Sequence, residues 1–349
     1  MKMADEQREN IMQVTRRTLT FGTVAALAAP AIIIPGRSAH AAEFTFKLGL
    51  VQPKDHIATQ ILDKYAAKMG EESKGRIDLR TYPSGQLGGD LDMIMQVKSG
   101  ALEFQLDSGT MLSNVVPPAG INAVGFAFKD SKQAWQAMDG PLGATIREAL
   151  DAGGMHCFPT CFEQGFRQLT TSKRKVENVG DVKNLKLRLP IGPVWTSLWS
   201  NMGAAPTSID ITELYTALQT GVVEGSEGPL QQIETFKLYE VQKFIAMTNH
   251  MWDNWWVFTN KAMWQKLPAD LQEIMARNFE AAAQEERAAI LADNQHTADL
   301  LKSQGVTFTD PDIASFRDKL KSTSYYKDWS AKYGPKVWGA LEQVVGKLT

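Results

Sequence analysis

Short apolar strands and amphipathic helices alternate along the first part of the chain. The order is strand, helix, strand, helix, strand over residues 44–51, 58–73, 77–82, 91–99 and 104–107. This alternation is typical of a parallel α/β sheet, because each crossover helix carries the chain back to the start of the next strand. It excludes an all-helical or all-strand fold for this part of the protein.

The second half of the chain repeats the alternation with shorter strands. Helices are predicted over 193–202 and 211–220, and the segment 155–162 is compatible with a strand or a crossover. Strands are predicted over 168–171, 186–190, 205–209, 222–225, 242–248 and 255–260. A chain of 349 residues suits about two domains. No linker-like segment separates the halves, so we expect two lobes joined by strands that cross between them.

A long helical segment runs from Pro268 to about Gln304 with no internal glycine or proline. At 1.5 Å per residue its length is roughly 50 Å, which exceeds the diameter of one small domain. We therefore predict one helix that spans both lobes. The alternative is a pair of helices with a kink near Asn294.

The N-terminus has the pattern of an export signal. The paired arginines of Thr15-Arg16-Arg17-Thr18-Leu19 precede an apolar run over 21–35, which is followed by the small-residue site Ala39-His40-Ala41. The apolar run is shorter than the roughly 20 residues that span a membrane, which argues against the alternative of an anchor. We expect residues 1–41 to be a twin-arginine-type signal peptide, cleaved near Ala41, and the mature protein to be soluble in the periplasm.

Composition and motifs exclude several function classes. The net charge is −2 and the basic residues are scattered, so a nucleic-acid partner is not expected. Nucleophile-elbow, phosphate-loop and zinc-protease motifs are absent, and the five histidines lack ligand spacing. We therefore predict no enzyme activity, no catalytic residue, no metal and no cofactor. The alternative is an exported hydrolase whose catalytic residues lie far apart in sequence and come together only in the fold.

The two cysteines, Cys157 and Cys161, allow two interpretations. On an extended segment they lie about 13 Å apart, too far for a disulfide. A bend at Pro159 could bring them together, and export would permit the bond. Two buried free thiols are the other interpretation.

Two arginines are candidates for binding an anion. Arg188 lies in the alternating strand Asn184-Leu185-Lys186-Leu187-Arg188-Leu189-Pro190, and Arg167 lies in Gly165-Phe166-Arg167. An arginine among apolar strand residues can meet a carboxylate with two parallel hydrogen bonds. A surface position on an edge strand is the alternative for both.

Several motifs occur in the order found in one known family. They are Tyr82-Pro83-Ser84-Gly85-Gln86-Leu87-Gly88, Gly165-Phe166-Arg167-Gln168-Leu169-Thr170-Thr171, the run 181–190 around Arg188, Gly203-Ala204-Ala205-Pro206-Thr207, and the run 213–229 that ends in Glu227-Gly228-Pro229. Together they resemble the solute-binding proteins of TRAP transporters, of the DctP type, over nearly all of residues 44–305.

The resemblance implies a two-lobed periplasmic-binding-protein fold of class α/β, each lobe a mixed sheet flanked by helices. We place lobe I at 42–164 plus 255–295 and lobe II at 165–254 plus 296–349. It also implies capture of a small organic-acid anion and delivery to a small and a large membrane permease subunit. Arg188 would pair with the carboxylate and Arg167 would support it. A periplasmic ligand sensor is the alternative function.

Six further residues are predicted ligand contacts. Phe162 and Trp195 neighbour the two arginines in sequence, and Trp252 lies in an aromatic-rich segment, although core packing is the alternative for all three. Ser108 follows a strand, and Asp210 starts a helix, where an N-cap role competes. Gly228 replaces an asparagine that is common in the family, so we expect a lost hydrogen bond and a larger pocket.

Overall fold

Ten strands form one mixed sheet in the computed structural model, which describes residues 42–348. The predicted signal peptide (1–41) and residue 349 lie outside the described residues. The strands are β1 (Phe44–Gly49), β2 (Ile77–Tyr82), β3 (Phe104–Ser108), β4 (Met155–Cys157), β5 (Phe162–Thr171), β6 (Lys186–Leu189), β7 (Ala205–Ser208), β8 (Gly225–Gly228), β9 (Phe244–Asn260) and β10 (Thr307–Thr309).

Helices follow most strands, as the alternating pattern predicts. The α-helices are α1 (Ile57–Glu72), α2 (Asp90–Ser99), α3 (Gly109–Leu112), α4 (Ser131–Asp139), α5 (Pro141–Ala152), α6 (Pro193–Met202), α7 (Ile211–Gln219), α8 (Leu230–Thr235), α9 (Lys261–Trp264), α10 (Ala269–Ser303), α11 (Ile313–Lys321) and α12 (Tyr325–Val345). The 3₁₀ helices are η1 (Pro117–Ala123), η2 (Val179–Val182) and η3 (Leu238–Glu240).

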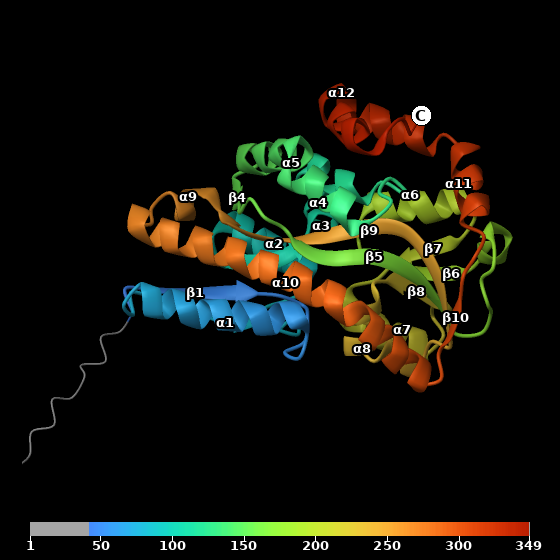
Figure 1. The fold of residues 1–349 in the computed structure, drawn as a ribbon, viewed down its shortest axis with the longest axis horizontal. Helices are drawn as coiled ribbons and strands as arrows, with labels where there is room; N and C mark the ends of the chain where they lie inside the picture. The colour runs from blue at the N-terminus through green and yellow to red at the C-terminus, as the bar shows by residue number, and fades with distance from the viewer. Residues whose placement is uncertain (1–41, 349) are drawn as a thin grey trace, which may run out of the picture. The chain divides into compact units, whose positions relative to one another are not determined.

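The sheet consists of two parallel sets joined by long antiparallel strands. Its order is β2-β1-β3-β9-β5-β8-β6-β7, with β4 and β10 paired to opposite ends of β9 (Figure 1). Strands β2, β1 and β3 are mutually parallel, as are β8, β6 and β7. Strand β9 runs antiparallel to both β3 and β5. The predicted α/β class with mixed sheets is confirmed.

Strand β9 is one 17-residue strand, although the sequence predicts two strands separated by 249–254. The prediction fails because His250, Asp253 and Asn254 are polar and yet fully buried, so the apolar alternation is interrupted. Tertiary partners satisfy these groups: Thr110 and Asn122, for example, donate to Asp253 Oδ1 over 3.0 and 2.9 Å. The predicted strand over 222–225 is also displaced, because β8 starts only at 225.

Helix α10 is a single helix of 35 residues, which confirms the predicted long helix. Its buried side includes Leu271, Met275 and Phe279 and packs on α1 and β5, and its C-terminal half contacts α8 (Figure 1). The predicted alternative of a kink near Asn294 is not observed. Asn294 instead accepts a hydrogen bond from Gln231 of α8 over 2.7 Å. The helix therefore ties together elements that are distant along the chain.

The C-terminal helix α12 packs on α4, α5 and α6 (Figure 1). It bends at Gly334, whose φ of 76° lies in the left-handed region that favours glycine, immediately before Pro335. At its start, the Tyr325 hydroxyl accepts from the Gly125 backbone N–H over 3.1 Å, and the Tyr326 hydroxyl donates to the Gly125 carbonyl over 3.0 Å. These contacts hold α12 against the loop that follows η1.

Cys157 and Cys161 are both free and buried, so the interpretation as free thiols is correct. The Cys161 sulfur accepts a hydrogen bond from Arg287 Nη2 over 3.1 Å, and Arg287 also pairs with Asp139. Burial raises the pKa of Cys161 to about 11, which keeps this sulfur as a thiol at neutral pH.

Candidate functional site

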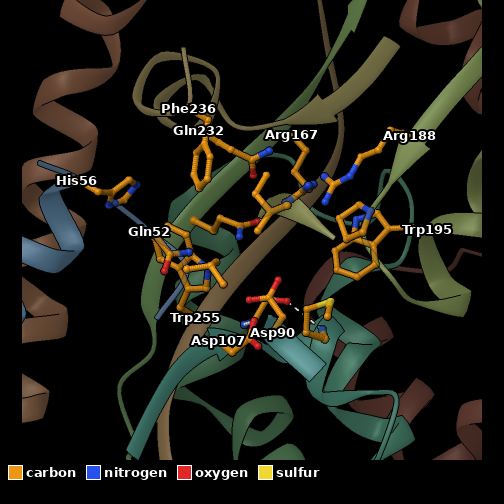
Figure 2. A pocket seen from close by; sticks show the side chains of 16 residues that line it. Gln52, His56, Asp90, Asp107, Arg167, Arg188, Trp195, Gln232, Phe236 and Trp255 are labelled. Atoms are coloured by element: carbon orange, nitrogen blue, oxygen red, sulfur yellow. Dashed lines mark hydrogen bonds between the residues drawn. The ribbon is translucent and has the colours of Figure 1, made fainter. Parts of the chain in front are cut away.

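A cavity opens where β3 and β6 end and α6 and α8 begin. Its walls come from both parallel sets of the sheet and from β5 and β9, and its volume is about 40 Å³ (Figure 2). Ligand sites of open α/β sheets lie at the carboxyl ends of the strands, which is where this cavity is found.

Arg188 is buried on the cavity wall without an acidic partner. Its side chain is 1% exposed, and its Nε donates to the Ile209 carbonyl over 2.8 Å. Among residues 42–348, no side chain or carbonyl accepts a hydrogen bond from its two terminal nitrogens. Burial lowers the pKa of Arg188 to about 10, while the charge of Glu227 acts in the opposite direction. The guanidinium remains a cation at neutral pH and has a free two-nitrogen edge.

Strand β6 explains how Arg188 reaches this position. Leu187 and Leu189 are fully buried, Arg188 points toward the cavity, and Lys186 is exposed at the start of the strand. The chain then turns into α6, which has Pro193 in its first turn and ends at Gly203 in the left-handed conformation. The strand is short, so its arginine lies at the end that faces the cavity.

Arg167 also lines the cavity, but its charge is already compensated. Its Nε and Nη2 donate to the two carboxylate oxygens of Glu227 over 2.6 and 2.8 Å, and its Nη1 donates to Gln164. Both partners of the pair are almost fully buried. Burial opposes the charge, but the attraction of Glu227 outweighs it and raises the pKa of Arg167.

Glu227 is held on its other side by a histidine. Its Oε2 lies 3.0 Å from His250 Nε2, and His250 Nδ1 lies 2.8 Å from the Thr248 hydroxyl. Burial alone would raise the pKa of Glu227, but Arg167 and His250 lower it to about 2. Burial lowers the pKa of His250, so the ring is neutral at neutral pH. These contacts link Arg167, Glu227, His250 and Thr248 in one buried network.

Trp195 forms the cavity wall beside the arginines. Its ring lies 5.4 Å from the Arg167 guanidinium carbon, and it is 1% exposed. Its Nε1–H is buried and has no hydrogen-bond partner among the described residues. The ring passes so close to Gly192 that a Cβ there would lie 2.8 Å from a ring carbon, which explains the glycine before α6.

The opposite wall carries two carboxyl groups, Asp90 and Asp107 (Figure 2). Burial, with a contribution from Asp210, raises the pKa of Asp90 to about 7, and its Oδ1 has no partner among the described residues. Burial also raises the pKa of Asp107, whose oxygens accept from the Ser108 backbone N–H over 2.6 Å and from Gln105 over 2.8 Å. The raised pKa values favour the protonated form, so the carboxyl groups of this wall can both accept and donate hydrogen bonds.

Ser108, Gln52, His56 and Trp255 complete this wall. The Ser108 hydroxyl caps α3 by accepting from the Met111 backbone N–H over 2.9 Å. His56 caps α1 through Nδ1 and packs edge-on against Trp255 with 5.3 Å between ring centres. Burial lowers the pKa of His56 to about 4, so it lines the cavity as a neutral ring.

The remaining four predicted contacts do not line the cavity. Phe162 lies in the apolar cluster beneath α1 and α10, and Trp252 donates to Glu163 over 3.0 Å and packs on Phe128. Phe162 was predicted from its proximity to Arg167 in sequence and Trp252 from its aromatic-rich segment, and neither signal specifies the side of a strand. Asp210 caps α7 through the Thr212 backbone N–H over 3.0 Å, the competing role anticipated for it.

Gly228 differs from the expectation of a larger pocket. A Cβ at this position would lie 2.7 Å from Gln232 Nε2, so the Gln232 side chain occupies the space. Gln232 lines the cavity, as do Phe236 and Asp90, and none of the three was predicted. Gln232 and Phe236 follow Gly228 by one and two helical turns, a spacing that could have suggested them.

Two further observations concern metal binding and membrane spans among the described residues. No group of three or more His, Cys, Asp or Glu side chains in this part of the chain is arranged to bind a metal ion. Among residues 42–348, no helix combines the length and the apolar character needed to cross a bilayer.

Comparison with known proteins identifies the family. Residues 48–331 match the model of the bacterial extracellular solute-binding proteins of family 7, DctP. The y4mM protein of Sinorhizobium fredii is 32% identical over 304 residues, 87% of this chain and 56% of that relative. The 2,3-diketo-L-gulonate-binding periplasmic protein YiaO of Escherichia coli is 29% identical over 266 residues, 76% of this chain and 80% of the relative.

A solved structure supports the same family assignment. The sugar acid binding protein DctPAm of Advenella mimigardefordensis, in complex with galactonate, superposes with a TM-score of 0.83 at 26% identity, covering 89% of this chain and all of that one. The chain therefore belongs to the DctP family of bacterial extracellular solute-binding proteins, which are ligand-binding receptors of TRAP transport and not enzymes.

Proposed function

We propose that this protein captures a small organic-acid anion in the cavity beside Arg188 and delivers it to the small and large membrane subunits of a TRAP transporter. The observation that carries the proposal is the buried, unpaired guanidinium of Arg188. A buried cation is costly without a counterion, and a carboxylate on the free edge of Arg188 would supply one through two charge-assisted hydrogen bonds.

The polarity of the cavity favours a hydroxylated monocarboxylate. One wall offers donors, Arg188 and the Trp195 Nε1–H, and the other carries the carboxyl groups of Asp90 and Asp107, which can accept and donate. A ligand with a carboxylate at one end and hydroxyl groups at the other matches both walls, whereas a second carboxylate would face two acidic groups. YiaO is named for binding 2,3-diketo-L-gulonate, and the structure of DctPAm is a complex with galactonate; both acids have this character.

We propose that capture involves closure of lobe I (42–164 and 255–295) on lobe II (165–254 and 296–349). Strands β5 and β9 join the two parallel sets, and their pairing shifts register between Glu163 and Gly165, opposite Asn254 and Asp253. Such bulges can absorb the backbone change of a hinge. Helix α12 contacts helices of both lobes, so closure would also involve this helix.

The proposal includes export to the periplasm, with residues 1–41 removed near Ala41. The twin arginines and the small-residue site support it, and so does the word "periplasmic" in the name of the relative YiaO. Mass spectrometry of the protein recovered from the periplasm tests the cleavage: the expected N-terminus is Ala42, and retention of residues 1–41 would contradict it.

Affinity cannot come from Arg188 alone. A charge-assisted hydrogen bond contributes about 1.5–3 kcal/mol net, whereas micromolar binding needs about 8 kcal/mol. The other donors and acceptors, together with burial of the ligand body against Trp195, Phe236 and Trp255, would supply the rest.

Titration calorimetry with galactonate and 2,3-diketo-L-gulonate tests the site. Arg188→Ala should weaken binding by about 2–4 kcal/mol, roughly 30- to 1,000-fold, because the carboxylate is then buried without its partner. Lys186→Ala is the matched control, since Lys186 is exposed on the same strand. Unchanged affinity in Arg188→Ala would remove the basis of the proposal.

The transport role needs a separate measurement. Uptake of the bound acid into proteoliposomes that contain the small and large membrane subunits should require this protein. Binding without any stimulation of uptake would favour a periplasmic ligand sensor instead.

A further inference from the structure

The Gln232 side chain is in an unusual position beside Gly228. Its Nε2 lies 2.7 Å, and its amide carbon 2.9 Å, from where a Cβ of residue 228 would be. Gln232 lies on α8, one turn after Gly228, and Figure 2 shows its amide between the Phe236 ring and Arg167. The amide can occupy this place only because residue 228 has no side chain.

The Gln232 amide group is also unsatisfied. Its Nε2 is buried and has no hydrogen-bond partner among residues 42–348, although the side chain lines the cavity. A buried donor without an acceptor costs about 1–3 kcal/mol, so such a group indicates a missing partner. Arg167 and Arg188, which share this side of the cavity, have no acceptor to offer it.

The neighbouring Gln231 provides a contrast on the same helix. Its Nε2 donates to Asn294 Oδ1 of α10 over 2.7 Å, so it has a structural partner. Gln232 has no equivalent contact. Two adjacent glutamines therefore differ in role: one fastens α8 to α10, and the other presents a free donor to the cavity.

We propose that Gln232 is a ligand-binding residue that determines specificity by donating its Nε2–H to an oxygen of the bound anion, and that Gly228 is required to make room for it. This inference rests on the proposed function, since it assigns a second donor for the same anion. The two positions act as one unit, in which residue 228 supplies the space and residue 232 supplies the hydrogen bond.

The test uses calorimetry with galactonate and 2,3-diketo-L-gulonate on the full protein after export, with the melting temperature measured in parallel. Gln232→Ala should bind about 5- to 20-fold more weakly with little change in melting temperature. Gln232→Glu, which keeps the shape but replaces the donor by a negative charge, should lose more than 50-fold. Gln219→Ala, at the exposed end of α7, is the matched control.

Gly228→Asn tests the shared space. Alone it should lower both the affinity and the melting temperature, because its Cβ collides with the Gln232 amide. Combined with Gln232→Ala, the melting temperature should return toward that of the wild type and the affinity should exceed that of Gly228→Asn alone.

The outcomes separate the two proposals. Wild-type affinity in both Gln232 variants, with binding lost in Arg188→Ala, would overturn the role of Gln232 and leave the proposed function intact. Equal losses of affinity in Gln232→Ala and Gln232→Glu, with no recovery of affinity or melting temperature in the double variant, would mean that Gln232 only packs against its neighbours. That result would overturn the inference. Failure of both acids to bind the wild type would overturn the proposed ligand class, and this inference with it.

Discussion

Two buried arginines, Arg167 and Arg188, line the same cavity and differ in what surrounds them. Arg167 is enclosed by Glu227 and Gln164, which take up all three of its nitrogens. Arg188 has one carbonyl partner, Ile209, and a free edge. Equal burial therefore does not imply an equal environment: the charge of the first arginine is compensated inside the protein, and the second keeps a free hydrogen-bonding edge.

The sheet register explains the difference. Strand β8, which carries Glu227, lies directly beside β5 and Arg167. Arg188 on β6 is paired in register with Thr207 of β7 and Ser226 of β8, and neither can neutralise its charge. The Glu227 carboxylate, on the adjacent strand β8, attracts Arg188 without a hydrogen bond, because both of its oxygens already accept from Arg167. The arrangement of neighbouring strands, and not the depth of burial, leaves one charge uncompensated.

The largest expected effect is loss of the Arg167 pair. Arg167→Met should lower the free energy of unfolding by about 3–5 kcal/mol, because Glu227 is left buried and unpaired. The pKa of Glu227 is about 2 in the fold, below its ordinary value of 4.5. The stabilisation by the pair is therefore complete above pH 4.5 and decreases as the pH falls toward 2. The loss of unfolding free energy in Arg167→Met should accordingly be larger at pH 8 than at pH 4.

Urea denaturation at the two pH values measures this effect. Glu227→Gln in the Arg167→Met background serves as the control and should recover part of the stability by removing the unpaired charge. A loss below about 1 kcal/mol in Arg167→Met would mean that the pair is not structural.

An intermediate effect is expected at Asp90, which faces the arginines across the cavity. Its pKa is raised to about 7, so the carboxylate form destabilises the fold increasingly as pH rises from about 4 to 7. Asp90→Asn should therefore raise the free energy of unfolding at pH 8, by up to about 4 kcal/mol, and change it little at pH 4.

The same denaturation series checks the Asp90 prediction, with Asp92→Asn on the exposed side of α2 as the control. An Asp90→Asn gain that does not vary between pH 4 and pH 8 would show that this carboxyl titrates normally. Asp90 would then no longer count as a carboxyl group with a raised pKa on the wall that faces Arg188.

The smallest expected effect has the opposite sign to the first. Arg188→Met keeps most of the packing and removes a buried charge whose pKa is lowered to about 10, so the free energy of unfolding should rise by about 1–3 kcal/mol without ligand. Binding of galactonate should weaken in the same variant, by roughly the 30- to 1,000-fold expected for Arg188→Ala. Destabilisation comparable to that of Arg167→Met would erase the distinction between the two arginines.

Local pattern was sufficient for much of the fold. The helix from Ala269 to Ser303 and the strand around Arg188 were predicted with nearly correct bounds, because apolar periodicity marks both. Strand β9 was predicted as two pieces, since buried His250, Asp253 and Asn254 look like loop residues until their partners are known. The sequence alone does not reveal whether the fold will supply a polar side chain with hydrogen-bond partners.

The site was predictable only in part for the same reason. Motif order identified Arg167 and Arg188 together. Proximity in sequence suggested Phe162 as a ligand contact and an aromatic-rich segment suggested Trp252, whereas both side chains lie in the core. Gln232, Phe236 and Asp90 carry no motif of their own. They reach the cavity because α8 and α2 begin at the same edge of the sheet.

The sequence by itself determined the α/β alternation, the long helix and the presence of two arginines in the motifs of the family, because these depend on local periodicity and residue identity. Only the tertiary structure decided which arginine has a counterion, and that Gln232 fills the space at Gly228. Both depend on distances between strands and helices far apart along the chain, and electrostatic and steric energies are set by those distances.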